Sequence, residues 1–271
     1  MTMSAYFERL DSDRYRPTIH AGGAWNAAEI HFSPLGGLVV HAIDLHRAAQ
    51  APDGQQPDGQ QPDSKQLGRI SFDILGFLAA EDCTIRVETI RPGRTIELVE
   101  ASVAIAGRTA VLARAWFIDV VDTTSVAGGE PEALPGPDAL TRWPMDDTWP
   151  GGYIDSLEVR PLRPPVPGRA TAWLGTDTRL VAGEIASPHA SFITLVDTAN
   201  GIAVRQPPTS WLYPNLDLTI HLYRQPEGSW VGLDTTVTFG PAGHGLTSSV
   251  LHDTSGPVGR AEQILTIRPP R

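Results

Sequence analysis

The sequence predicts an α+β fold that is built twice. Each half has one apolar, helix-like stretch, which begins near Gly36 in the first half and near Ser191 in the second. Three extended segments follow each stretch and recur about 147 positions apart: residues 70–73, 83–93 and 113–118, then residues 216–221, 231–240 and 260–267. A helix followed by a long antiparallel sheet, present twice, indicates two fused copies of a small α+β unit with a cleft where they meet.

The length and composition fit two domains. At 271 residues and 41% hydrophobic content the chain can bury a substantial core. We expect a first unit over residues 1–121, a linker over 122–152 and a second unit over 153–271. The linker is rich in Gly, Pro and acidic residues, and Trp143 and Trp149 within it indicate that it packs on the surface.

The net charge and the cysteine content limit the classes of partner and the cellular compartment that we expect. The net charge of -10 argues against a nucleic acid or an anionic membrane as partner. The single cysteine, Cys83, has no internal disulfide partner, the N-terminus has no apolar signal region, and no run is long enough to span a membrane. We therefore expect a soluble cytoplasmic protein.

Local patterns predict the elements of the first half. Residues 22–26 predict a turn, and residues 29–32 predict a short strand. Residues 36–48 predict a helix that is apolar on most sides, which belongs inside a fold. Residues 50–66 contain a tandem polar pentapeptide with nothing to bury, which predicts a flexible surface loop, with a docking peptide as the alternative.

The second half has the clearer periodicity. Residues 191–201 predict a helix that Gly201 ends. Residues 215–223 alternate between apolar and polar side chains, which predicts a strand with one face toward the core.

Several familiar catalytic signatures do not occur in the sequence. It has no Gly-x-Ser-x-Gly elbow, no Walker loop and no Cys-x-x-Cys, which disfavours α/β serine hydrolases, P-loop enzymes and thiolate zinc sites. The glycines of residues 240–245 lie between two predicted strands and indicate a turn. Asp217 and His221 share a strand face and could touch a metal ion, but no further ligand is spaced to complete a site. We therefore expect no metal centre.

Asp197 is the strongest candidate for chemistry. A carboxylate in an apolar helix loses hydration, so it needs a partner, a raised pKa or a function. It either compensates the helix dipole from the first turn or reaches a surface loop, or it acts as a general base. Asn215 and Gln263 are amides on half-buried strands, where each is either a satisfied strand residue or part of a catalytic site.

Several segments carry a resemblance to a known family: residues 31–40, 70–75, 90–95, 194–200, 215–224 and 258–263. In their order and spacing they resemble the acyl-CoA thioesterase II type of double-hotdog protein, and more closely the related actinobacterial thioesterase-like proteins. The resemblance implies a tandem hotdog, in which each curved antiparallel sheet wraps a central helix. It also implies a hydrolase of lipid metabolism that acts on fatty acyl-CoA without a cofactor.

The resemblance also implies a site. The family holds a water molecule among an Asp, a Thr or Ser, and a Gln. Asp197 matches the Asp and Gln263 matches the Gln, whereas Asn215 stands at the hydroxyl position. An asparagine can hold water but cannot relay a proton, so the departure leaves the efficiency of hydrolysis open.

The physical requirements of such a site extend the list of candidate residues. Backbone N–H groups near Gly36 and Gly37, or in the Ser191 helix, would face the oxyanion. Asp73 occupies the position in the first half that corresponds to the site in the second half, so it is a further substrate-binding candidate. The phosphates of CoA need cations, and the candidates are Arg69, Arg91, Arg94, Arg205 and Arg224, each of which could instead be an ordinary surface charge.

Two other functions stay open. A double hotdog that has lost turnover through Asn215 would bind acyl-CoA or an acyl-carrier thioester without hydrolysing it. A hotdog hydratase uses an Asp and His pair on the central helix, and the nearest histidine along the chain is His189, eight positions before Asp197. Assembly into a homo-oligomer is neither required nor excluded.

Overall fold

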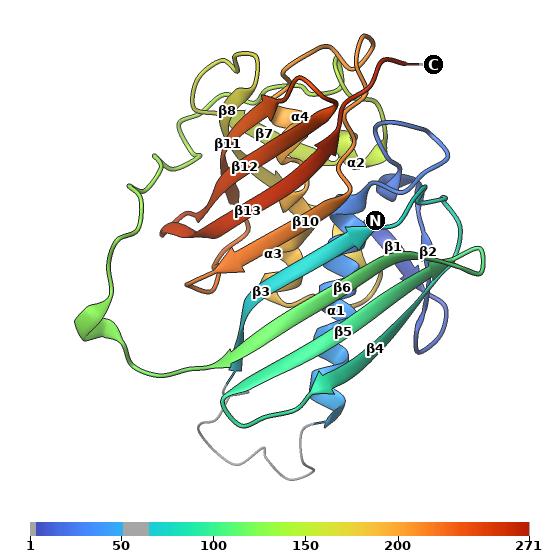
Figure 1. Ribbon diagram of the computed structural model, residues 1–271, viewed down its shortest axis with the longest axis vertical. Coiled ribbons are helices and arrows are strands. Elements are labelled where there is room, and N and C mark those ends of the chain that lie inside the picture. Colours follow the sequence, from blue (N-terminus) through green and yellow to red (C-terminus); the bar gives the residue numbers. More distant parts are fainter. Residues whose placement is uncertain (1–3, 51–64, 271) are drawn as a thin grey trace.

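The computed structural model describes residues 4–50 and 65–270. Over these residues the strands form one sheet of thirteen, in the order β7-β8-β11-β12-β13-β10-β3-β6-β5-β4-β2-β1-β9. Figure 1 shows this sheet as two curved parts that meet where β3 lies beside β10, with α1 and α3 behind it. The repeated arrangement of helix and antiparallel sheet confirms the predicted α+β class.

The first half supplies one end of the sheet. Its elements are β1 (Ala5–Arg9), β2 (Arg14–Pro17), the short helix η1 (Ile19–Ala21), α1 (Phe32–Gln50), β3 (Lys65–Ile74), β4 (Cys83–Arg91), β5 (Ile96–Ile105), β6 (Arg108–Asp119) and the short helix η2 (Thr124–Val126).

The second half repeats the order of helix and sheet. Its elements are α2 (Gly152–Asp155), β7 (Leu157–Pro161), β8 (Arg169–Thr176), β9 (Arg179–Val181), α3 (Pro188–Val196), α4 (Ala199–Ile202), β10 (Asp217–Leu222), β11 (Val231–Phe239), β12 (His244–Asp253) and β13 (Gly256–Thr266).

The two halves are joined by a strand ladder and by a helix pair. β3 and β10 pair in antiparallel fashion, with Ile70 opposite Ile220, and both side chains are fully buried. α1 packs on α3, where Gly37 allows the helices to approach: a Cβ at this position would lie 2.0 Å from Thr194 Oγ1. The core is therefore continuous across the boundary between the halves.

Some boundaries in the first half differ from the prediction. α1 begins at Phe32, so residues 29–32 are not a strand, although Glu29 and Ile30 form isolated bridges. Gln50 is the last residue of α1, and β3 already begins at Lys65. The rest of the predicted loop over 50–66 lies outside the described residues.

The predicted helix over 191–201 is two helices. α3 ends at Val196 and α4 begins at Ala199, so that Asp197 and Thr198 stand between them and Gly201 lies inside α4. The run of buried apolar side chains across this region gives a single periodic signal, which hides the break.

The predicted strand over 215–223 is confirmed over β10, with its ends trimmed. Leu218, Ile220 and Leu222 are buried as the alternation predicts. Leu216, just before the strand, is 49% exposed, so the predicted burial of this face fails at that end.

The segment between the halves packs on the fold through its aromatic residues. Trp149 is buried, and its Nε1 donates to the carbonyl oxygen of Gly201 at 2.9 Å, while Trp143 packs against the core. The prediction that the tryptophans anchor this segment is confirmed. The domain boundaries at 121 and 152 stay a prediction.

Candidate active site

A cavity of about 610 Å³ lies between the two halves. Its walls come from the segment before α1, the end of β3, the α3–α4 break and the segments beside β10 and β13. The lining includes Trp25, Ile30, His31, Phe32, Leu78, Asp197, Leu212, Asn215 and Arg268. Its size is within the usual range for a small-molecule site, and most of this lining is apolar.

The three predicted catalytic residues come together at this cavity. Asn215 Nδ2 donates to Asp197 Oδ1 at 2.8 Å, and Gln263 Nε2 donates to the same oxygen at 2.7 Å. Asp197 caps the C-terminus of α3, Asn215 precedes β10 and Gln263 lies on β13. Residues that are far apart in sequence therefore converge on one carboxylate oxygen.

Burial makes Asp197 a weak acid. Loss of hydration raises its pKa from 3.8 to about 7, although the bonds from Asn215 and Gln263 lower it, and nearby Asp217 raises it. Compensation of a helix dipole from the first turn is wrong, because Asp197 stands at the C-terminal end, where the dipole disfavours a negative charge. A carboxylate with a pKa near neutrality is suited to accept and return a proton.

His31 lies closer to Asp197 than any histidine considered from the sequence. Its Nδ1 is 3.9 Å from Asp197 Oδ2, the oxygen that the two amides leave free. Burial lowers the pKa of His31 to about 3, so the ring is neutral and this contact is not an ion pair. No spacing in the sequence predicts this pair, because the two residues belong to different halves of the chain.

Aromatic side chains support the wall of the cavity. Trp25 packs edge-on against Trp149 and Tyr213, with ring centroids 4.7 Å and 5.1 Å apart. Tyr153 stacks on His31 at 4.2 Å and donates to the carbonyl oxygen of Thr194 at 3.0 Å. These contacts hold one side of the site in place from the segment between the halves and from α2.

The predicted oxyanion donors lie elsewhere. Gly36 and Gly37 are inside α1, one turn after its start at Phe32, and Gly37 provides the close approach to α3. Their N–H groups are therefore not the free donors of a helix N-terminus, and this expectation is wrong. The N-terminus of α3 is also remote, since a helix of nine residues places it about 13 Å from Asp197.

The predicted cations do not line the cavity. Arg224 forms two 2.7 Å bonds with buried Asp253, and Arg91 donates to the carbonyl oxygen of Ile96. Arg69 lies within β3, opposite His221. Arg94 and Arg205 are likewise absent from the described cavity lining.

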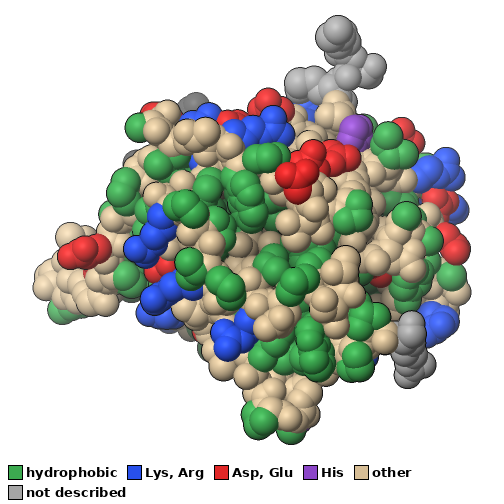
Figure 2. Space-filling model, turned by 90° about the horizontal axis from the view of Figure 1, so that it is seen from above, with side chains coloured by type: hydrophobic (Ala, Val, Ile, Leu, Met, Phe, Trp, Pro, Cys, Tyr) green, Lys and Arg blue, Asp and Glu red, His purple; other side chains and the backbone are tan. Residues whose placement is uncertain are grey.

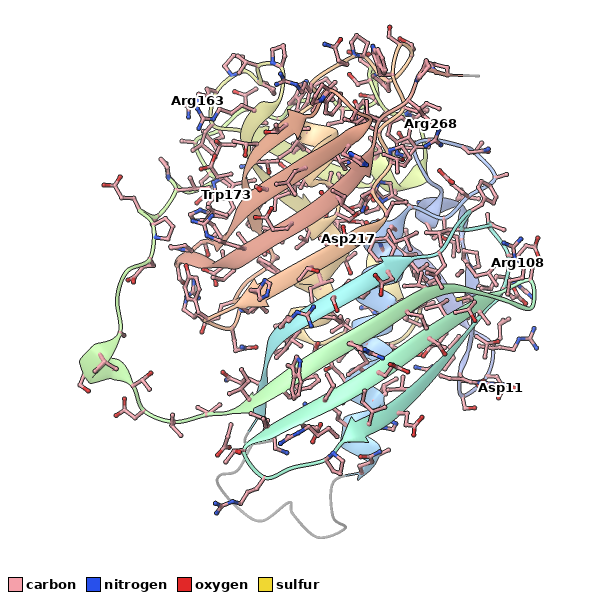
Figure 3. The ribbon with its side chains drawn as sticks, in the orientation of Figure 1. Asp11, Arg108, Arg163, Trp173, Asp217 and Arg268 are labelled. Atoms are coloured by element: carbon pink, nitrogen blue, oxygen red, sulfur yellow. The ribbon has the colours of Figure 1, made fainter. Side chains whose placement is uncertain are left out.

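Asp73 was expected at the substrate site and is not there, whereas Arg268 was not expected and lines the cavity. Asp73 is exposed at the β3–β10 ladder, opposite Asp217, and does not line the cavity. Arg268 does line it and is held by two backbone bonds with Leu212, of 2.8 Å and 2.9 Å. Figure 3 shows Arg268 beyond the end of β13, on the same side of the sheet junction as Asp217. Arg268 follows the last strand, where no hydrophobic periodicity predicts the position of a side chain.

The described residues contain neither a metal-binding cluster nor a membrane-spanning helix. Within residues 4–50 and 65–270 no group of three or more His, Cys, Asp or Glu side chains is placed to hold a metal ion. Asp217 accepts the N–H of Ile264 at 2.6 Å. No helix in the described part of the chain has the length and apolar character needed to cross a membrane. On the face in Figure 2, Lys and Arg side chains are separated by acidic, polar and apolar ones.

Comparison with solved structures supports the double-hotdog fold. A conserved protein with a hot dog fold from Alicyclobacillus acidocaldarius is 13% identical with a TM-score of 0.71, covering 97% of this chain and 96% of its own. An acyl-CoA thioesterase II from Mycobacterium marinum is 16% identical with a TM-score of 0.63, covering 97% of this chain and 95% of its own. A search of curated protein sequences finds no match.

Family models match both halves of the chain. Residues 21–118 match the acyl-CoA thioesterase N-terminal domain, and residues 137–267 match the acyl-CoA thioesterase C-terminal domain. Because these two ranges span most of the sequence and the fold agrees, the chain belongs to the acyl-CoA thioesterase family of double-hotdog proteins.

Proposed function

We propose that this protein hydrolyses fatty acyl-CoA to a free fatty acid and CoA, with Asp197 as general base. The observation that carries the proposal is the buried carboxylate of Asp197, which lines an apolar cavity and receives both amide donors on one oxygen. That arrangement fixes the carboxylate and leaves Oδ2 free to accept a proton from water.

The chemistry follows from this geometry. Asp197 accepts a proton as the water oxygen bonds to the thioester carbon, and the π electrons of the carbonyl move to its oxygen. When the tetrahedral intermediate collapses, the C–S bond breaks and the proton on Asp197 passes to the departing thiolate. Gln263 Oε1 is buried without a partner among the described residues, so it is suited to accept the second hydrogen of the water.

The cavity has an apolar part that suits the acyl chain and a cationic residue that suits the phosphates of CoA. Trp25, Ile30, Phe32, Leu78 and Leu212 offer an apolar surface to an acyl chain. Arg268 offers a guanidinium to a CoA phosphate in place of the arginines expected from the sequence.

Thiol release from a panel of acyl-CoAs of different chain lengths tests the proposal. Asp197→Ala and Gln263→Ala should each lower kcat about a hundredfold or more, as expected for loss of a positioned base and its support. Asp11→Ala, which changes an exposed aspartate, is the control. Wild-type turnover that neither site variant reduces would refute the site.

Hydration of an enoyl thioester is the second candidate, since His31 supplies the histidine near Asp197 that the sequence did not show. His31 Nδ1 accepts the N–H of Ser33 at 3.1 Å, so in the neutral ring Nε2 carries the proton. No ring nitrogen is then free to act as a base, which favours hydrolysis. Loss of enoyl-CoA absorbance without thiol release would reverse this preference.

A binding protein without turnover is the third candidate, because Asn215 replaces the family hydroxyl. Asn215 donates to Asp197 directly, which stabilises the ionised base and does not remove it. Tight acyl-CoA binding without thiol release from any substrate would favour the binding protein.

A further inference from the structure

Neither the glycines of α1 nor the N-terminus of α3 offers a donor for the thioester oxygen. Gly36 and Gly37 lie inside α1, and the N-terminus of α3 is at the far end of its helix from Asp197. Attack by water places negative charge on that oxygen, and hydrolysis needs a hydrogen-bond donor there.

His31 is held in one orientation by three contacts. Its Nδ1 accepts the N–H of Ser33 at 3.1 Å, which caps the first turn of α1. Its ring stacks on Tyr153 with centroids 4.2 Å apart, and its backbone N–H donates to the carbonyl oxygen of Ala21 at 2.8 Å. A side chain fixed in this way needs little reorganisation when a substrate arrives.

The capping bond also fixes where the proton of the ring lies. Because Nδ1 accepts from Ser33, the neutral imidazole carries its proton on Nε2. Nε2 has no hydrogen-bond partner among the described residues, and His31 lines the cavity. The ring therefore presents a donor, and no acceptor, to a ligand.

His31 and Asp197 line the same cavity. His31 lies on the side of Asp197 that carries the free oxygen, with 3.9 Å between Nδ1 and Oδ2. Because a separation of 3.9 Å leaves no room for another heavy atom between them, the water and the thioester would lie beside this pair, in the cavity that both residues line.

We propose that His31, through Nε2–H, is a catalytic residue that donates a hydrogen bond to the thioester oxygen as the tetrahedral intermediate forms. The inference rests on the proposed thioesterase function. In this proposal the second half of the chain contributes the base and the first half contributes the oxyanion donor. No proton leaves His31 in this step, and the oxyanion charge returns to the carbonyl when the C–S bond breaks.

Two substitutions at one position separate this role from the capping role. In His31→Asn the side-chain oxygen can still accept the Ser33 N–H, since asparagine is a good N-cap, but the Nε2–H donor is lost. His31→Gln keeps an N–H donor of similar reach. We expect kcat to fall about a hundredfold in H31N with KM changed less than about threefold, and H31Q to retain more activity.

Tm and the pH profile distinguish a structural effect. H31N should keep the wild-type Tm to within roughly 2–4 °C, the change that about 1 kcal/mol produces. The acid limb of its activity, which Asp197 sets, should stay near pH 7. Unchanged kcat in H31N, a rise in KM alone, or a shifted acid limb would overturn the role of His31. A wild type that releases no thiol from any acyl-CoA would instead refute the proposed function itself.

Discussion

Replacing Asp197 by asparagine should inactivate the protein and stabilise it. The wild type holds a carboxyl whose pKa is about 7 in the folded state and 3.8 without burial. Each pKa unit is worth about 1.36 kcal/mol, so ionising this group costs about 4 kcal/mol more in the folded protein than in the unfolded chain. Asparagine keeps an oxygen for the amides of Asn215 and Gln263 and carries no charge.

The sign of the pH dependence follows from the raised pKa. The folded state binds the proton more tightly than the unfolded chain, so the stabilisation is fully present below about pH 4 and is lost as the pH rises through about 7. The Asp197→Asn variant lacks this loss. Its advantage in unfolding free energy over the wild type should therefore grow with pH and approach about 4 kcal/mol near pH 8.

Thermal unfolding followed by circular dichroism, near pH 4 and near pH 8, measures this difference. For a chain of this size about 4 kcal/mol corresponds to a rise in Tm of roughly 8 °C or more at the higher pH. The exposed Asp11→Asn variant should follow the wild type at both pH values. A Tm of Asp197→Asn that equals or falls below the wild-type value near pH 8 would refute the reasoning about burial.

Three further predictions follow from other contacts. The activity of the wild type should rise with pH along an acid limb near 7, because the base must be ionised; a rate independent of pH between about 5 and 8 would contradict this. Gly37→Ala should lower stability by about 1–3 kcal/mol through the α1–α3 contact, whereas Gly136→Ala, with open space around it, should not; chemical denaturation compares them. Arg224→Ala should lower the free energy of unfolding by about 3 kcal/mol, because the buried carboxylate of Asp253 loses its cation, with KM for acyl-CoA unchanged; a raised KM would restore Arg224 to the substrate site.

The fold could be predicted because it rests on repeated local patterns. The apolar helix and the alternating strand over β10 are periodic, and the recurrence at about 147 positions reports the duplication. The helix break at Asp197 could not be predicted, because the apolar residues on both sides continue one pattern.

Part of the site was predictable. Asp197 was singled out because a carboxylate in an apolar helix needs a partner or a function, and the resemblance assigned it and Gln263 to one site. In the structure Gln263 Nε2 lies 2.7 Å from Asp197 Oδ1. The positions of His31 and Arg268 in the cavity lining could not be predicted, since both reach the cavity through tertiary contacts. The arginines chosen from the sequence illustrate the reverse error, because Arg224 has its own buried partner in Asp253.

The antiparallel ladder between β3 and β10 has a consequence for how the protein behaves on dilution. In a site shared between separate subunits, the complete form disappears when the concentration falls below the dissociation constant. Here both strands belong to one polypeptide, so their pairing is intramolecular and its effective concentration does not depend on that of the protein. The proximity of His31 and Asp197 should therefore be the same in a nanomolar assay as in a concentrated stock.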